Sequence, residues 1–88
     1  MLMPEISRFY GIVVRLFFND HEPPHFHAIY GEHEVLVEIE TLTIYRGYLP
    51  HRALALVLEW AALRRDDLRR DWALARQGSP LEPISPLD

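Results

Sequence analysis

The chain has no cysteine and no lysine, and acidic residues or prolines interrupt every apolar run. Without cysteine, neither a disulfide nor a cysteine-held zinc site can form, so any metal would be held by His, Asp or Glu. No run reaches the roughly 18 apolar residues of a membrane-spanning helix, and the N-terminus lacks a basic segment followed by an apolar stretch. These absences predict a cytoplasmic protein that is neither secreted nor embedded in a membrane.

The composition is typical of one small folded domain. The chain has 88 residues, of which 49% are hydrophobic and 11% aromatic. This content is high enough to form a core, and the length leaves no room for a second one, so residues 1–88 are predicted to form a single domain. The net charge of −4 combines an acidic part, residues 1–49, with an arginine-rich part, residues 50–78. Such a balance disfavours a wholly basic nucleic-acid binder.

Hydrophobic patterning predicts four antiparallel strands within residues 9–48. Residues 10–18 are rich in β-branched and aromatic side chains, and the polar loop 19–24, which contains a diproline, ends this strand. A second strand over 25–30, a turn at Gly31-Glu32 and an alternating third strand from residue 33 follow. A fourth strand around 43–48 completes the predicted sheet.

Residues 51–77 contain neither glycine nor proline and end at Gly78-Ser79-Pro80, which predicts one C-terminal helix with a candidate kink at 64–67. One apolar stripe at helical spacing is suited to cover the sheet: Leu54, Val57, Leu58, Ala61, Leu68, Trp72 and Ala75. A second stripe, Leu56, Trp60 and Leu63, points elsewhere and needs cover from the Pro-rich tail, 79–88, or from another chain. The predicted fold is α+β: a four-stranded antiparallel meander packed on one long or kinked C-terminal helix, then an extended tail.

Three of the five histidines lie within HEPPHFH, residues 21–27. With the turn at Gly31-Glu32, His25 faces Glu38 across the strands while Phe26 lies on the opposite, apolar face. His25, His27, Glu34 and Glu38 then share one face, with His21 in the loop above.

This cluster has three interpretations. His21, His25, His27 and Glu38 can hold a divalent metal such as zinc, since two imidazoles and a carboxylate form a common metal site. Alternatively, His25 and His27 act as acid and base with Glu38 orienting one imidazole, an arrangement that suits hydrolysis of a phosphodiester without a cofactor. In the third interpretation the histidines are a hydrogen-bonded polar pair without chemistry.

The segment 64–71 is a run of arginines and aspartates around Leu68, and the i, i+4 spacing of Asp66 and Arg70 favours a solvent-exposed helix face of ion pairs. The functional alternative is contact with nucleic-acid phosphates through Arg64, Arg65, Arg69 and Arg70. No glycine-rich phosphate loop or internal repeat accompanies them.

Nearly the whole chain resembles the small bacterial family described as domain of unknown function 4160. The resemblance is carried by the NDH-x-PPHFHA stretch, residues 19–28, and extends through LPHRALALVLEWA and the arginine-rich segment to the tail. It implies a short stand-alone bacterial protein, often encoded beside another small uncharacterised protein, an arrangement that suggests a toxin–antitoxin pair.

Two functions follow as hypotheses. In the first, the protein is a ribonuclease-like toxin that uses His25, His27 and Glu38, with the helix arginines as phosphate contacts. In the second, it is a non-catalytic protein-binding module, stabilised by a divalent metal on its histidines. Its partner, a small neighbouring-gene protein or a second copy, then docks on Leu56, Trp60 and Leu63.

Overall fold

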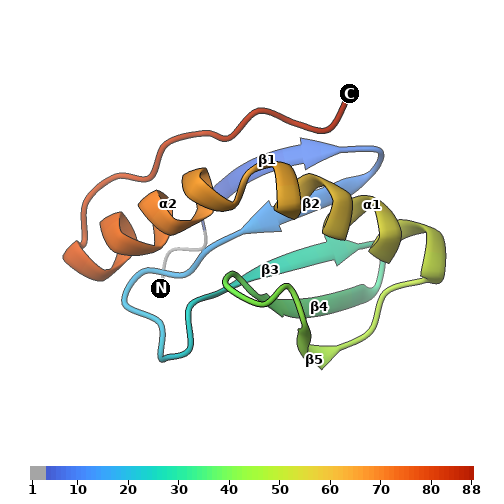
Figure 1. The fold of residues 1–88 in the computed structure, drawn as a ribbon, viewed down its shortest axis with the longest axis horizontal. Coiled ribbons are helices and arrows are strands. Elements are labelled where there is room, and N and C mark those ends of the chain that lie inside the picture. The colour runs from blue at the N-terminus through green and yellow to red at the C-terminus, as the bar shows by residue number, and fades with distance from the viewer. Residues whose placement is uncertain (1–3) are drawn as a thin grey trace.

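The computed structural model describes residues 4–88, which form a five-stranded antiparallel sheet followed by two helices (Figure 1). The strands follow one another in meander order: β1 (Glu5–Phe9), β2 (Ile12–Arg15), β3 (His25–Tyr30), β4 (His33–Glu38) and β5 (Ile44–Gly47). The helices α1 (His51–Leu63) and α2 (Arg65–Gln77) cover one face of the sheet, and the tail runs back past them toward β1. The predicted α+β class is confirmed.

The prediction of four strands was wrong by one, because β1 lies ahead of the first predicted strand, 10–18, and the first two residues of that predicted strand form a turn. Tyr10 and Gly11 both have positive φ, 50° and 79°, and form the tight turn between β1 and β2. A bulky tyrosine is unusual in that conformation, so the sequence did not mark a turn there. The additional strand, β1, is short and has an irregular register next to Glu5, which also weakens its alternating pattern.

The register between β3 and β4 is as predicted. His25 lies opposite Glu38 and Phe26 opposite Val37, with the turn at Gly31-Glu32. Phe26, Ala28, Val35 and Val37 are fully buried beneath the helices. The histidines of β3 therefore lie on the other face of the sheet.

The predicted single helix is two helices, separated at Arg64. This residue has φ −116° and ψ 22°, outside the helical region, and its N–H reaches the carbonyls of Trp60 and Ala61. The break falls where the sequence allowed a kink, and it shortens an element that would otherwise be long for so small a sheet. Within residues 4–88, no helix is long and apolar enough to cross a membrane.

Trp60 is fully buried, which corrects its assignment to a stripe facing away from the sheet. Its ring packs against Phe9 and Phe26, with centroids 5.3 and 5.8 Å away, so it belongs to the central core. The indole Nε1–H donates to the carbonyl of Ser85 in the tail at 2.8 Å. The tail therefore packs on the core. Cover of Trp60 by the tail is one of the two alternatives that the sequence predicted.

Two further contacts fix the tail. The backbone N–H of Ile84 donates to the carbonyl of Ile6 at 2.7 Å, and the Ile84 side chain is buried in the core. The backbone N–H of Glu82 donates to Oδ1 of Asp71, a fully buried carboxyl group on α2. Burial raises the pKa of Asp71, and the hydrogen bond from Glu82 and the charge of Arg70 offset this only in part.

We expect Ile84→Ala to lower the free energy of unfolding by about 2 to 5 kcal/mol, because it leaves a cavity beneath the tail. Ser85→Ala is the matched control, since it keeps the carbonyl that accepts from Trp60 and changes an exposed side chain. Urea denaturation of both variants measures the difference. Equal stabilities would contradict the role assigned to the tail.

Asp71 should make the stability depend on pH. Its pKa is higher in the folded protein than its ordinary value of 3.8, so the folded state holds the proton longer than the unfolded state does. Its contribution to stability therefore falls as the pH rises through this window. We expect the stability of Asp71→Asn relative to the wild type to increase as the pH rises above the ordinary value of 3.8 toward neutrality. A constant difference in denaturation across that range would refute the raised pKa.

Candidate metal centre

The loop between β2 and β3, residues 16–24, folds back over the start of β3. Its conformation is held by backbone hydrogen bonds from Asn19 N–H to the Ala75 carbonyl of α2 and from Ile39 N–H to the Pro24 carbonyl. Asn19 has φ 55°, a left-handed conformation that asparagine tolerates better than most residues. The loop therefore brings Asp20 over the two histidines of β3.

His25 and His27 each use one ring nitrogen to hold their orientation. Nδ1–H of His25 donates to the carbonyl of Pro23 at 2.7 Å, and Nδ1–H of His27 donates to Oε2 of Glu34 at 2.9 Å. Because Nδ1 carries the proton in both rings, both Nε2 atoms are left as the free nitrogens. Both point toward Asp20.

Asp20 is held in the same manner. Its Oδ1 accepts from the backbone N–H of His21 at 2.8 Å and from Nδ1–H of the same residue at 2.7 Å. Its Oδ2 lies 3.0 Å from Nε2 of His25 and 3.5 Å from Nε2 of His27. Burial acts to raise the pKa of Asp20, but the hydrogen bonds from His21 and the interactions with the imidazoles of His25 and His27 outweigh it, so the pKa lies below its usual value.

The three converging atoms have the spacing of ligands to one ion. Oδ2 of Asp20 and Nε2 of His25 and His27 all lie within 4.8 Å of one another. Ligands bound to zinc at about 2.1 Å in tetrahedral geometry are roughly 3.4 Å apart. Both Nε2 atoms are buried, and neither has a hydrogen-bond partner among the described residues, although Asp20 is close. Asp20, His25 and His27 therefore form a candidate metal site.

Aromatic rings enclose the histidines. Phe17 stacks on His27 with a centroid separation of 4.2 Å and an interplanar angle of 5°. The rings of Tyr45 and Trp72 lie 5.3 and 5.4 Å from that of His25, which is fully buried. This apolar wall restricts the ring positions, and the side chains of His25, His27 and Asp20 are only 0%, 9% and 15% exposed.

The sequence predicted part of this arrangement. His25 and His27 are brought together, whereas His21 lies outside them, exposed, with its Nδ1 on Asp20. Glu38 lies opposite His25, but its carboxylate accepts from Thr41 at 3.5 Å, and the groups next to the His25 ring nitrogens are Asp20 and the carbonyl of Pro23. Asp20 lies in the polar loop predicted at 19–24, and its place beside His21 in the NDH stretch is the signal that could have identified it.

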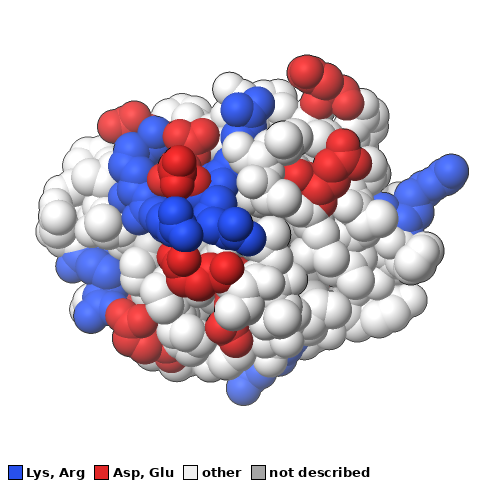
Figure 2. All heavy atoms as spheres, viewed as in Figure 1, with Lys and Arg blue, Asp and Glu red and all other residues white. Residues whose placement is uncertain are grey.

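The arginines expected to contact nucleic acid lie in and beside α2 and are engaged elsewhere. Arg69 makes two hydrogen bonds to Glu40, at 2.7 and 2.9 Å, and Arg70 pairs with Asp67 at 3.1 Å. Nε of Arg65 donates to the Ile39 carbonyl, and Nε of Arg64 is buried. Figure 2 shows the cations of this region bordered by acidic side chains. Phosphate contact would have to displace these pairs.

The residues predicted to meet a partner chain are separated by the fold. Trp60 is buried under the tail, Leu56 is half-buried, and only Leu63 is largely exposed. The tail covers Trp60, Leu56 packs against the core, and Leu63 is left uncovered. Contact with a partner through Leu63 stays a prediction.

The chain belongs to the family described as domain of unknown function DUF4160, whose model matches residues 11–73. The match includes the site loop, β3, β4 and most of both helices. No curated protein and no solved structure matches the chain.

Proposed function

We propose that this protein is a metal-binding module whose divalent ion is held by Oδ2 of Asp20 and by Nε2 of His25 and His27. The observation that carries the proposal is that the second polar atom of each ligand is already occupied: Oδ1 of Asp20 by His21, and the two Nδ1 atoms by Pro23 and Glu34. Partners of this kind orient metal ligands and raise their basicity. An ordinary hydrogen-bonded pair on the surface does not need a second hydrogen bond on each of its side chains.

The donor atoms favour a borderline transition metal. Two imidazoles and one carboxylate suit zinc and also the two-histidine, one-carboxylate sites of ferrous iron, whereas calcium and magnesium prefer oxygen ligands. Three protein ligands leave at least one coordination position for water or for a group from another molecule. Zinc is therefore the first ion to test.

The ion ties the loop 16–24 to the sheet. Asp20 comes from the loop and both histidines come from β3, so binding joins two segments that the unfolded chain does not hold together. Metal binding of this kind is linked to folding. At a free ion concentration 100 times the Kd, one site that exists only in the folded state adds about 2.7 kcal/mol of stability.

We expect Asp20→Asn to reduce zinc affinity by about 100-fold or more and to remove the increase in Tm caused by zinc, because the amide cannot replace the charged ligand. Glu38→Gln is the matched control: it removes an acidic group beside His25 in the register that is not one of the three ligands. Calorimetric titration with zinc, with thermal unfolding in parallel, measures both effects.

Two outcomes would overturn the proposal. One is an unchanged Tm of the wild type in zinc at concentrations that saturate ordinary histidine sites. The other is equal loss of affinity in Asp20→Asn and Glu38→Gln, since an ion held by diffuse negative charge would depend on both carboxylates.

A ribonuclease-like toxin is the second candidate, paired with a small neighbouring-gene protein in the cytoplasm. The observation in its favour is the proximity of the two imidazoles, whose centroids are 5.3 Å apart, with both free nitrogens directed to one side. Such a pair can share the roles of acid and base toward RNA. The burial of both Nε2 atoms and the pairing of Arg69 and Arg70 count against it.

The toxin proposal predicts that expression of the wild type arrests bacterial growth and that the purified protein cleaves RNA in the presence of EDTA. His25→Ala and His27→Ala should abolish both effects, whereas His33→Ala, in the exposed β3–β4 hairpin, should not. Circular dichroism confirms that the variants remain folded. Wild-type protein without growth arrest or cleavage would dismiss this candidate and leave the metal module untouched.

A further inference from the structure

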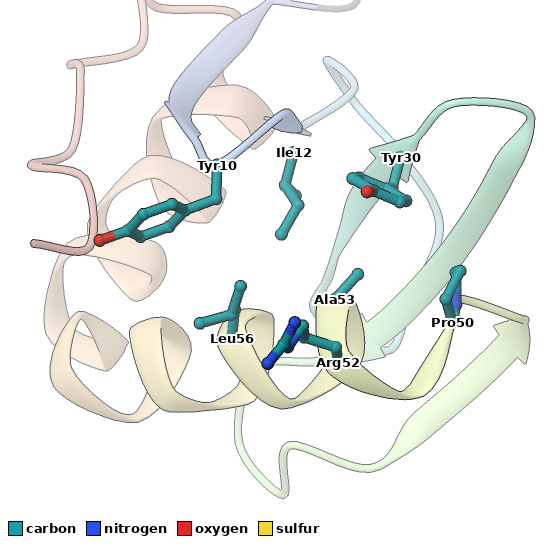
Figure 3. A pocket seen from close by; sticks show the side chains of 7 residues that line it. All are labelled: Tyr10, Ile12, Tyr30, Pro50, Arg52, Ala53 and Leu56. Atoms are coloured by element: carbon teal, nitrogen blue, oxygen red, sulfur yellow. The ribbon is translucent and has the colours of Figure 1, made fainter.

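A cavity lies at the other end of β3 from the candidate metal centre, on the side of the sheet that faces α1. Its volume is about 240 Å³. Figure 3 shows Tyr10 and Tyr30 on either side of Ile12, facing the first turns of α1. The full lining is Tyr10, Ile12, Tyr30, Pro50, Arg52, Ala53 and Leu56.

The tyrosines present large apolar faces to this cavity. Tyr10 is 59% exposed and Tyr30 39%, while Ile12 at the back is fully buried. Parts of both tyrosine rings are therefore accessible from the cavity. An aromatic ring of a ligand could pack against them.

The backbone at Tyr10 adds an independent observation. With φ at 50° followed by Gly11 at 79°, Tyr10 occupies the first position of a turn that asparagine or glycine would adopt with less strain. A non-glycine residue in this region costs free energy, and such strain tends to occur where a side chain is required for binding. Turn formation alone does not explain why residue 10 is a tyrosine. A role of its ring in the cavity, which it lines, would explain it.

The cavity also has a defined charge. Arg52 is its only cationic lining residue, and no lining residue is acidic. Within residues 4–88, no ion pair joins Arg52 to a carboxylate, and the first turn of α1 contains no acidic residue. A single guanidinium at the edge of an apolar cavity matches one negative charge, and its planar geometry fits a carboxylate through two parallel hydrogen bonds.

We propose that this cavity binds a small aromatic carboxylate, with its ring between Tyr10 and Tyr30 and its carboxylate on Arg52. The volume lies below the range of about 300 to 1,000 Å³ for drug-sized ligands, which limits the ligand to one or two fused rings. A phosphate, with more charge and more oxygens, would lack further cationic partners among the lining residues. This site is independent of the proposed metal centre, because no residue belongs to both.

The test uses indole-3-carboxylate and its neutral amide as probes, titrated into the full chain in EDTA so that the metal centre plays no part. Amide chemical shifts locate the binding site, and calorimetry measures affinity. We expect saturable shifts around residues 10–12, 30 and 52–56. Arg52→Gln should weaken carboxylate binding by about tenfold, to the level of the amide on the wild type. Arg46→Gln, on β5 and outside the cavity, is the matched control and should change nothing.

A second variant tests the aromatic part. Tyr10→Asn keeps a residue that favours the turn, so the fold should be retained. It should remove the preference for indole-3-carboxylate over cyclohexanecarboxylate. The proposal is overturned if millimolar probe produces no saturable shifts at these residues, if Arg52→Gln binds as tightly as the wild type, or if both acids bind equally to the wild type.

Discussion

The register between β3 and β4 is the constraint on which the rest of the structure depends. Because side chains alternate across a strand, the pairing of His25 with Glu38 and Phe26 with Val37 sends the apolar residues to the helices and the histidines to the opposite face. A slip of one residue would turn His25 and His27 toward Trp60 and turn Phe26 away from it, out of the apolar core. Core formation and site formation are therefore decided by the same pairing.

The loop 16–24 converts this face of the sheet into an enclosed centre. β3 supplies two imidazoles in fixed orientations, and the loop supplies the carboxylate together with the aromatic ring of Phe17. Asp20 is itself anchored by His21, and the loop is anchored to α2 through Asn19. In the proposed metal site these residues are a preformed ligand set, in which little side-chain freedom remains to be lost on binding.

The sequence predicted those features that depend on alternation and on turns: strands β3 and β4, their register, and the placement of His25 and His27. It did not predict β1, because a tyrosine in a left-handed turn hides the boundary between two strands. It also placed Trp60 outside the core, because helical spacing alone cannot tell which of two apolar stripes faces a sheet when a tail covers the other. Asp20 was missed for a related reason, since its role depends on how a loop folds back and not on a periodic pattern.

The most direct measurement is a crystal structure of the protein grown with zinc, with anomalous scattering recorded at the zinc edge. The account predicts one strong peak about 2.1 Å from Oδ2 of Asp20 and from Nε2 of His25 and His27, with Nδ1 of each histidine still on its present acceptor. Absence of a peak at these atoms, or a peak held by His21 and Glu38 instead, would contradict it.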